Sequence, residues 1–349
     1  MVEKLVDAGV IRESRSAYYS HGFVVPKSTP GEWRFVIDYK KLNKVCTTER
    51  WPLPNIESIL RRIGDERPQY FSVMDMMSGY HQAPVAEDTI PYTAFMTSAG
   101  LFEWTRVLMG PTGACSYFQK TMSREVFIGL VNHICEVYLD DLIVYSSNED
   151  QMIDRLRRVF ERAREKRITF NPKKCRFGLS SVEYIGHTID SEGIHFSRKK
   201  LDSILDFEIP ATQARMRSFI GFVNYFRDHV KDFAKLANPL IQTYKVYKPK
   251  RLIKYTDELQ KAFHVLVQAI NTCPKVYFLD DTLPIHLHTD ASDYGIGAFL
   301  FQIIVKMENG KRKETVQPVA FLSKSLNGRE SRWDVPQKEG FAIFSALNK

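Results

Sequence analysis

The stretch HICEVYLDDLIVYSS, residues 133–147, places two adjacent aspartates inside a run that is otherwise apolar and rich in β-branched residues. Its pattern predicts a strand, a tight turn carrying Asp140 and Asp141, and a second strand. An acidic turn is usually a solvated loop. Here the acids lie at the edge of a core, because six flanking residues are expected to be largely buried in a sheet: Ile134, Val137, Leu139, Leu142, Ile143 and Val144.

Crowded carboxylates at such a place repel one another and resist ionisation unless a cation compensates them. Mg²⁺ is the expected cation, because it binds one or two carboxylates together with substrate phosphates. A two-metal site needs a further carboxylate, and Asp75 supplies one at the end of the apolar segment FSVMD. We therefore predict that Asp75, Asp140 and Asp141 bind two Mg²⁺ ions, with Mn²⁺ as a substitute. The chemistry would be in-line attack of a 3′-hydroxyl on a nucleotide α-phosphate.

Length and composition limit the class of protein. The 349 residues suggest two or three domains, and a formal charge of +8 favours a polyanionic partner, although many basic proteins carry only solvated lysines. Five scattered cysteines without a C-x-x-C pair argue against a disulfide framework or a zinc site and favour a reducing, intracellular compartment. No signal peptide and no run of 18 apolar residues is present, so we expect a soluble protein that binds no membrane.

The periodicity along the chain predicts mixed helices and strands. Two strands surround a turn within residues 21–45, and a helix follows with Asn55 as its N-cap. Residues 116–130 and 149–167 have helical patterns, and residues 198–245 are helical and basic. After a lysine-rich connector at 246–254, a helix, three strands and a last helix are expected.

Nine ordered motifs resemble one known family. They are FVVPKSTPGEWRFVIDYKKLNK, PLPNIESIL, FSVMDMMSGYHQAPVAED, YTAF, ACSYFQKTM, VYLDDLIVYS, NPKKCRFG, YIGHTID and MRSFIGFVNYFR. The same order is found in reverse transcriptases of gypsy-type long-terminal-repeat retrotransposons. The resemblance implies an α+β right-hand polymerase, with fingers, a palm built on an antiparallel sheet and a thumb, followed by a truncated RNase H-like α/β domain. Fingers and palm would occupy residues 1–190, the thumb or connection 191–245, and the C-terminally incomplete RNase H-like domain 254–349.

The resemblance also implies roles around the nucleotide. Asp75, Asp140 and Asp141 match the family's catalytic carboxylates, with Asp140 the firmer metal ligand. The residues that match its nucleotide-binding positions are Lys27 and Arg34 for the triphosphate, Tyr80 under the sugar, and Met109 and Gly110 in the pocket wall. The alternatives are a solvated basic hairpin for Lys27 and Arg34 and core packing for Tyr80. Leu108 and Met109 depart from the family's proline followed by Phe or Gln, so this pocket could be retuned.

Two further regions match family features. Tyr184, Ile185, Gly186 and His187 resemble the hairpin that grips the primer end, and the basic helices of 198–230 resemble the thumb, although they could equally be solvated helix faces. Asp290 and Glu339 resemble two of the four acids of RNase H. Because the chain stops ten residues after Glu339, we expect a polyprotein fragment or a decayed copy without RNase H activity. The family's protease and integrase are absent from these residues.

The leading hypothesis is an RNA-directed DNA polymerase, a nucleotidyltransferase acting on an RNA template, a DNA primer, their RNA·DNA hybrid and dNTPs. It would work in a cytoplasmic element particle or in the nucleus, with self-association left open. One alternative is a decayed element remnant that only binds nucleic acid or a host partner. Another is a metal-dependent nuclease, which Tyr80, Lys27 and Arg34 disfavour because they suit a nucleoside triphosphate.

Overall fold

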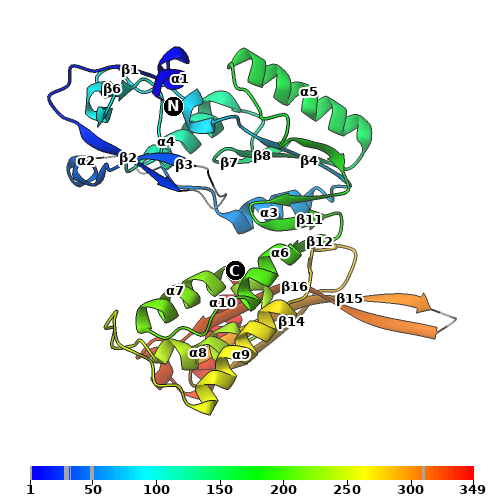
Figure 1. Ribbon diagram of the computed structural model, residues 1–349. Coiled ribbons are helices and arrows are strands. Elements are labelled where there is room, and N and C mark those ends of the chain that lie inside the picture. The colour runs from blue at the N-terminus through cyan, green and yellow to red at the C-terminus, as the bar shows by residue number, and fades with distance from the viewer. Residues whose placement is uncertain (1, 27–30, 32, 48–50, 309–310) are drawn as a thin grey trace. The chain divides into compact units, whose positions relative to one another are not determined.

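The computed structural model describes residues 2–26, 31, 33–47, 51–308 and 311–349. The chain divides into two compact units, Met1–Ile185 and Gly186–Lys349, and each has its own helices and sheets (Figure 1). The predicted α+β class is confirmed. Among the described residues, none of the helices is long and apolar enough to span a bilayer.

The first sheet of unit 1 has the strand order β1-β6-β5-β2-β3. Strands β2 and β5 run parallel, and the other neighbours run antiparallel. The helices of this part are α1 (Val2–Asp7) and α2 (Lys40–Val45). The strands are β1 (Ile11–Glu13), β2 (Ser20–Pro26), β3 (Trp33–Ile37), β5 (Phe95–Thr97) and β6 (Gly100–Trp104).

The second sheet of unit 1 has the order β7-β8-β4-β9, and every pair in it is antiparallel. Its strands are β4 (Tyr70–Asp75), β7 (Cys135–Tyr138), β8 (Asp141–Ser146) and β9 (Arg176–Leu179), and β10 (Ser181–Tyr184) closes the unit. The predicted strand, turn and strand are therefore confirmed, as is an antiparallel palm sheet. The helices here are α3 (Ile56–Asp65), α4 (Ala114–Thr121) and α5 (Glu149–Glu165).

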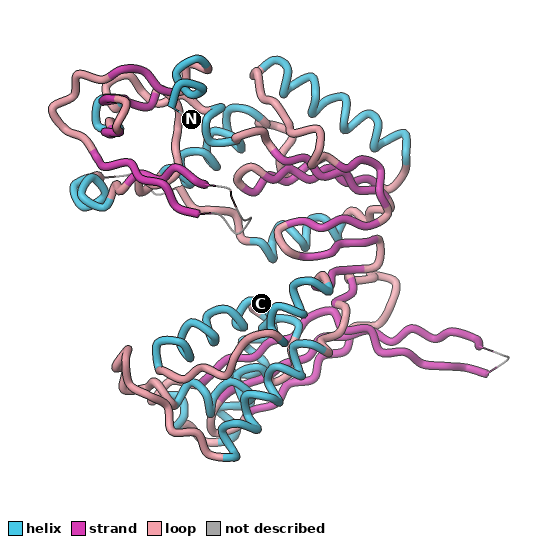
Figure 2. The backbone as a smooth tube through the Cα atoms, in the orientation of Figure 1, coloured by secondary structure: helices cyan, strands magenta, loops and turns pink. Residues whose placement is uncertain are grey.

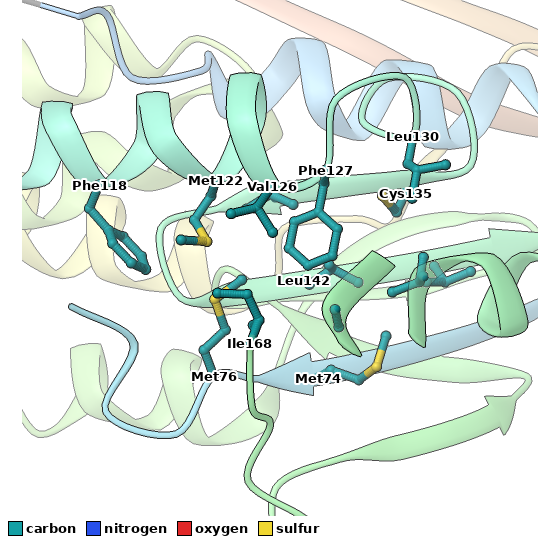
Figure 3. Packing of buried hydrophobic residues seen from close by; sticks show 14 of the residues in the cluster. Met74, Met76, Phe118, Met122, Val126, Phe127, Leu130, Cys135, Leu142 and Ile168 are labelled. Carbon is teal, nitrogen blue, oxygen red and sulfur yellow. The ribbon is translucent and has the colours of Figure 1, made fainter. Parts of the chain in front are cut away.

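A continuous apolar core holds α4, the turn that follows it and α5 against this sheet. Figure 3 shows Phe118, Met122 and Val126 directed from the α4 side toward Met76 and Leu142. Helix α5 packs on β8 and β4 and adds Met152, Val159 and Ala163. Because both faces of β4 and β8 carry apolar residues, these strands form a rigid base beneath the acidic turn.

The helix expected at 116–130 is shorter than its pattern suggested. Helix α4 ends at Thr121 and continues as a five-residue π-helix, Met122–Val126. The Phe127 amide donates to the Met122 carbonyl, an i to i+5 bond that widens the last turn. Met122 and Val126 are thereby both buried in the core.

Unit 2 begins with the antiparallel strands β11 (His187–Asp190), β12 (Gly193–Phe196) and β13 (Val276–Tyr277). Four helices share one apolar core: α6 (Arg198–Leu205), α7 (Gln213–Val223), α8 (Phe233–Gln242) and α9 (Asp257–Asn271). This core joins residues of the expected thumb to α9, which the sequence assigned to the RNase H-like domain. The boundaries of those two segments remain predictions.

The other sheet of unit 2 is three-stranded, with the order β14-β15-β16. Its elements are β14 (His286–Ala291), β15 (Gly295–Glu308) and β16 (Lys311–Ser325), and α10 (Val335–Leu347) packs on β14 and β15. Strand β14 pairs with β15 only as far as Phe301, so the rest of β15 pairs with β16 alone. Figure 2 shows β15 and β16 extending beyond β14 as a two-stranded antiparallel ribbon.

A buried ion pair in unit 1 gives a test of the packing. Glu136 on β7 is 1% exposed, and Arg62 on α3 binds both of its carboxylate oxygens at 2.8 Å. Arg62→Met leaves a buried charge unpaired, and we expect it to lower the free energy of unfolding by about 3–5 kcal/mol. Chemical denaturation measures this loss.

The double variant Arg62→Met with Glu136→Met is the matched control. It replaces both charges by apolar side chains and should recover most of the loss. Equal destabilisation by the single and the double variant would show that Glu136 does not depend on Arg62.

Candidate active site

The register between β4 and β8 brings the predicted acids together. Asp75, the last residue of β4, is the direct partner of Asp141, the first residue of β8, and Asp141 also pairs with Tyr138 on β7. Residues directly opposite in an antiparallel pair have Cβ atoms roughly 5 Å apart. Asp75, Asp140 and Asp141 therefore lie at one end of the sheet, as the sequence predicted.

A two-residue turn, Leu139 and Asp140, joins β7 to β8. Leu139 has a φ of +55°, a conformation that L residues with large side chains rarely adopt. The Met76 amide donates to the Asp140 carbonyl at 2.9 Å. Gly79 lies beneath this point, where an added Cβ would stand 2.9 Å from the Cβ of Asp140. The turn is thus supported from below by the bend that follows Asp75.

The charges at this end of the sheet are only partly balanced. Burial, followed by the charges of Asp140 and Asp75, raises the pKa of Asp141 from 3.8 to about 6. Lys174 binds Asp75, with 2.8 Å between Nζ and Oδ2, and this hydrogen bond raises the pKa of Lys174. The Lys174 side chain is 60% exposed and that of Asp75 20%. The cluster therefore still favours further positive charge.

Carboxylate oxygens are the donors that Mg²⁺ prefers, so these residues fit that ion by chemistry. Within the part of the chain that the structure describes, no group of three His, Cys, Asp or Glu side chains already converges as a metal site. Asp75 is instead engaged by Lys174. The backbone thus brings the residues that would hold the metal to one place. The carboxylate of Asp75 is bound there by the ammonium group of Lys174.

A second segment, residues 169–174, is tied to the chain around Asp75. The Asn171 amide donates to the Asp75 carbonyl and the Met77 amide to the Thr169 carbonyl. Gln82 completes the tie, because its Nε2 donates to the carbonyls of Met77 and Thr169 and its Oε1 accepts from the Thr169 amide. The sequence prediction missed Gln82 and Lys174, although both lie in quoted motifs, HQAP and NPKKC.

Tyr80 lies against the acidic cluster but is packed into the core. Its side chain is 6% exposed, its ring stacks on Phe118 with centroids 4.7 Å apart, and its hydroxyl donates to Cys115 Sγ. Burial and the Cys115 contact raise the pKa of Tyr80. The alternative of core packing therefore describes its position here, and the sugar-contacting role stays a prediction.

The remaining residues predicted to bind nucleotide lie on two segments. Met109 is 70% exposed, and Gly110 has a φ of +124°, where a Cβ would stand 3.2 Å from the Tyr39 ring. Asn43 holds this segment by donating to the Gly110 carbonyl and accepting from the Thr112 amide, a role the sequence prediction missed. Arg34 lies on β3 opposite Val25 with only its backbone described, and Lys27 lies outside the described residues.

A cavity of about 370 Å³ adjoins the segment that follows Gly110. Its wall includes Leu108, Thr112, Tyr117 and Lys120. Trp51, which is distant from them in sequence, also lines it. Lys120 and Arg124 lie over the Trp51 ring, 5.8 and 5.4 Å from its centroid. Of the predicted nucleotide-binding residues that the structure describes in full, Tyr80, Met109 and Gly110 do not line this cavity.

The residues predicted to grip the primer are divided between the ends of two units, with Tyr184 and Ile185 in unit 1 and Gly186 and His187 in unit 2. Tyr184, the last residue of β10, is 3% exposed, and burial raises the pKa of its hydroxyl well above the ordinary value. Ile185 and Gly186 follow with φ values of +48° and +74°, the pair of positive angles that a tight hairpin turn needs. In unit 2, His187 is buried, and its Nδ1 lies 3.0 Å from the Tyr225 hydroxyl.

Asp290 and Glu339 lie on packed elements of unit 2. Asp290 is exposed on β14 opposite Gly297, and Glu339 is partly buried on α10, which packs against β14. Near them, the buried Lys338 binds Asp293 at 2.7 Å and lowers the pKa of that carboxyl. All five cysteines are free thiols in the structure.

The raised pKa of Asp141 predicts that ionisation of this residue lowers the stability of the fold. The folded chain binds this proton more tightly than the unfolded chain, so the stability associated with protonated Asp141 is lost as the pH rises from about 4 through about 6. In the presence of EDTA, Asp141→Asn should raise the melting temperature by a few degrees at pH 8. The gain should shrink toward pH 4, and a gain that is equal at both pH values would contradict the assignment.

Comparison with known proteins places these residues in a family. Residues 25–189 match the model of the reverse transcriptase (RNA-dependent DNA polymerase) family, and residues 255–349 match the RNase H-like domain found in reverse transcriptase. In structure, the chain is similar to the foamy viral protease-reverse transcriptase in complex with RNA/DNA hybrid. The TM-score is 0.80 at 22% identity, over 99% of this chain and 45% of that chain. At this identity the likeness concerns the fold alone.

Relatives in sequence are Pol polyproteins of Drosophila melanogaster transposons. The polyprotein from transposon 412 is 35% identical over 352 residues, 99% of this chain and 27% of the relative. The polyprotein from transposon gypsy is 31% identical over 362 residues, 100% of this chain and 34% of the relative. The chain thus spans about a third of the length of the curated relatives it matches. The chain comprises a reverse transcriptase domain and an RNase H-like domain, and it is similar over its length to part of the gypsy-type Pol polyproteins.

Proposed function

We propose that this chain is an RNA-directed DNA polymerase that adds deoxynucleotides to the 3′-hydroxyl of a DNA primer on an RNA template. The observation that carries the proposal is the pairing of Asp75 with Asp141 across β4 and β8, with Asp140 in the adjoining turn. Family membership supports it, since the matched model is that of an RNA-dependent DNA polymerase. A foamy viral relative in structure was solved with an RNA/DNA hybrid, the product of such a reaction.

Asp75, Asp140 and Asp141 would hold two Mg²⁺ ions. When bound, such ions lower the pKa of the attacking 3′-hydroxyl and stabilise the charge on the departing pyrophosphate. The protein's part is to crowd three carboxylates so that they favour cations, and the raised pKa of Asp141 supports this. Lys174 balances one of those charges before metal and nucleotide arrive, and its exposed side chain is able to withdraw.

The incoming nucleotide would lie between these acids and the β2–β3 hairpin. Arg34 suits a triphosphate because a guanidinium donates two parallel hydrogen bonds, and Lys27 would add a mobile point charge. Tyr80 would lie under the sugar and exclude a ribose 2′-hydroxyl. Residues 184–187 and the basic helices of unit 2 would contact primer and template phosphates, which fixes position without reading sequence.

Primer extension tests the proposal directly. The wild-type chain should extend a DNA primer on poly(rA) with dTTP and Mg²⁺ or Mn²⁺, and Asp140→Asn should reduce the rate to background because a metal ligand is lost. Arg157→Gln, which changes an exposed charge on α5, serves as a folded control. Equal extension by wild type and Asp140→Asn would refute the proposal. Hybrid binding without extension by either would favour the decayed remnant.

Sugar selection tests the role of Tyr80. Tyr80→Ala should reduce the preference for dTTP over UTP by roughly ten- to a hundredfold, because the steric block to the 2′-hydroxyl is removed. Tyr80→Phe is the matched control. It loses only the hydroxyl contact to Cys115 and should keep the preference. If Tyr80→Ala keeps full selectivity while it remains folded, Tyr80 is a core residue only.

A further inference from the structure

Gln119 is a fully buried polar residue close to the turn that carries Asp140. It lies on α4 and is 0% exposed. Its Nε2 donates to the Val137 carbonyl at 3.0 Å and to Ser123 Oγ at 2.8 Å, and its Oε1 accepts from the Leu139 amide at 2.7 Å. One side-chain amide thus satisfies both a carbonyl at the end of β7 and the first amide of the turn.

The backbone that Gln119 holds is strained. Leu139 has a positive φ and Asp140 does not, which is the pattern of a type II′ hairpin turn. Glycine is the favoured residue at the first position of such a turn, and a leucine there persists only where its surroundings hold it. The Leu139 amide donates a hydrogen bond to Gln119, and this contact ties the backbone of Leu139 to helix α4.

The same turn is held from its other side by the chain after Asp75. The Met76 amide binds the Asp140 carbonyl, and Gly79 leaves room for the Asp140 side chain. The backbone of Asp140 is therefore fixed on one side by the hydrogen bond from the Met76 amide and on the other side by the conformation of Leu139. A change in the Leu139 conformation would redirect Asp140 and the start of β8, where Asp141 lies.

We propose that Gln119 is a positioning residue, whose amide sets the Leu139–Asp140 turn so that the carboxylates of Asp140 and Asp141 are held ready for divalent metal. This inference rests on the proposed polymerase function. The chemistry needs a donor toward Val137 and an acceptor toward Leu139 on one side chain, which an amide offers. A glutamate offers two acceptors, a leucine or methionine offers neither, and an asparagine is one methylene too short.

Three variants of the full chain separate positioning from folding. Gln119→Leu removes both contacts, and Gln119→Glu keeps the acceptor but loses the donor. The matched control is Gln302→Leu on β15 in unit 2. Gln302 is 1% exposed and likewise donates to a carbonyl, that of Asp280, and accepts from an amide, also that of Asp280. Both leucine variants should lower the melting temperature to a similar extent.

Metal dependence is the readout that a purely structural role would not move. We expect Gln119→Leu to lower the extension rate at saturating dTTP at least tenfold and to raise the half-saturating Mg²⁺ concentration several-fold, with the KM for dTTP changed less. Gln119→Glu should fall between this variant and wild type. Gln302→Leu should leave all three constants unchanged per folded molecule.

Mn²⁺ binding makes the test independent of turnover. Electron paramagnetic resonance should show several-fold weaker Mn²⁺ binding to Gln119→Leu than to wild type or Gln302→Leu, each bound to a dideoxy-terminated primer on poly(rA). If wild type extends no primer, the polymerase proposal fails, and this titration still decides the role of Gln119. Unchanged Mn²⁺ affinity and an unchanged Mg²⁺ requirement in Gln119→Leu would overturn the inference.

Discussion

The pairing of Asp75 with Asp141 is the constraint on which the rest of unit 1 depends. Two strands that are apolar on both faces bring two carboxylates into direct opposition at their ends, and a tight turn adds a third. Such an arrangement is unfavourable by itself, since burial and like charges both oppose ionisation. The surrounding elements support it through the bond from Met76 to Asp140, the space at Gly79 and the charge of Lys174.

The register of β4 and β8 is fixed by burial. Phe71, Met74, Leu142, Val144 and Tyr145 are each no more than 1% exposed, so a slip by one residue would exchange side chains of different shape between two packed faces. The same slip would move Asp75 away from Asp141. The core shown in Figure 3 thus sets the geometry of the acids as well as the stability of the unit.

The sequence predicts this hairpin and its acids because both signals are local, a period of two residues and a turn between apolar runs. It does not predict the partners that hold them. Gln119 meets Leu139 from 20 positions away and Lys174 meets Asp75 from 99, and no periodicity encodes such contacts. The π-helix after Thr121 was missed for a similar reason, because Met122 and Val126 satisfy a helical pattern while tertiary packing widens the turn. Tyr80 shows the converse: its motif indicated a role at the sugar, and its burial follows from packing on Phe118.

Two buried or half-buried acids, on the strands that flank β8, receive their cations in different ways. Glu136 is closed in by the Arg62 guanidinium, a planar fork whose two bonds fix it in one geometry. Asp75 receives a single bond from Lys174, a flexible point charge with most of its side chain in solvent. A permanent partner suits a residue that only supports β7, whereas an exchangeable partner suits a carboxylate that has to release one cation and accept another. The contrast between arginine and lysine therefore separates the structural acid from the acid assigned to chemistry, although both lie within the same sheet.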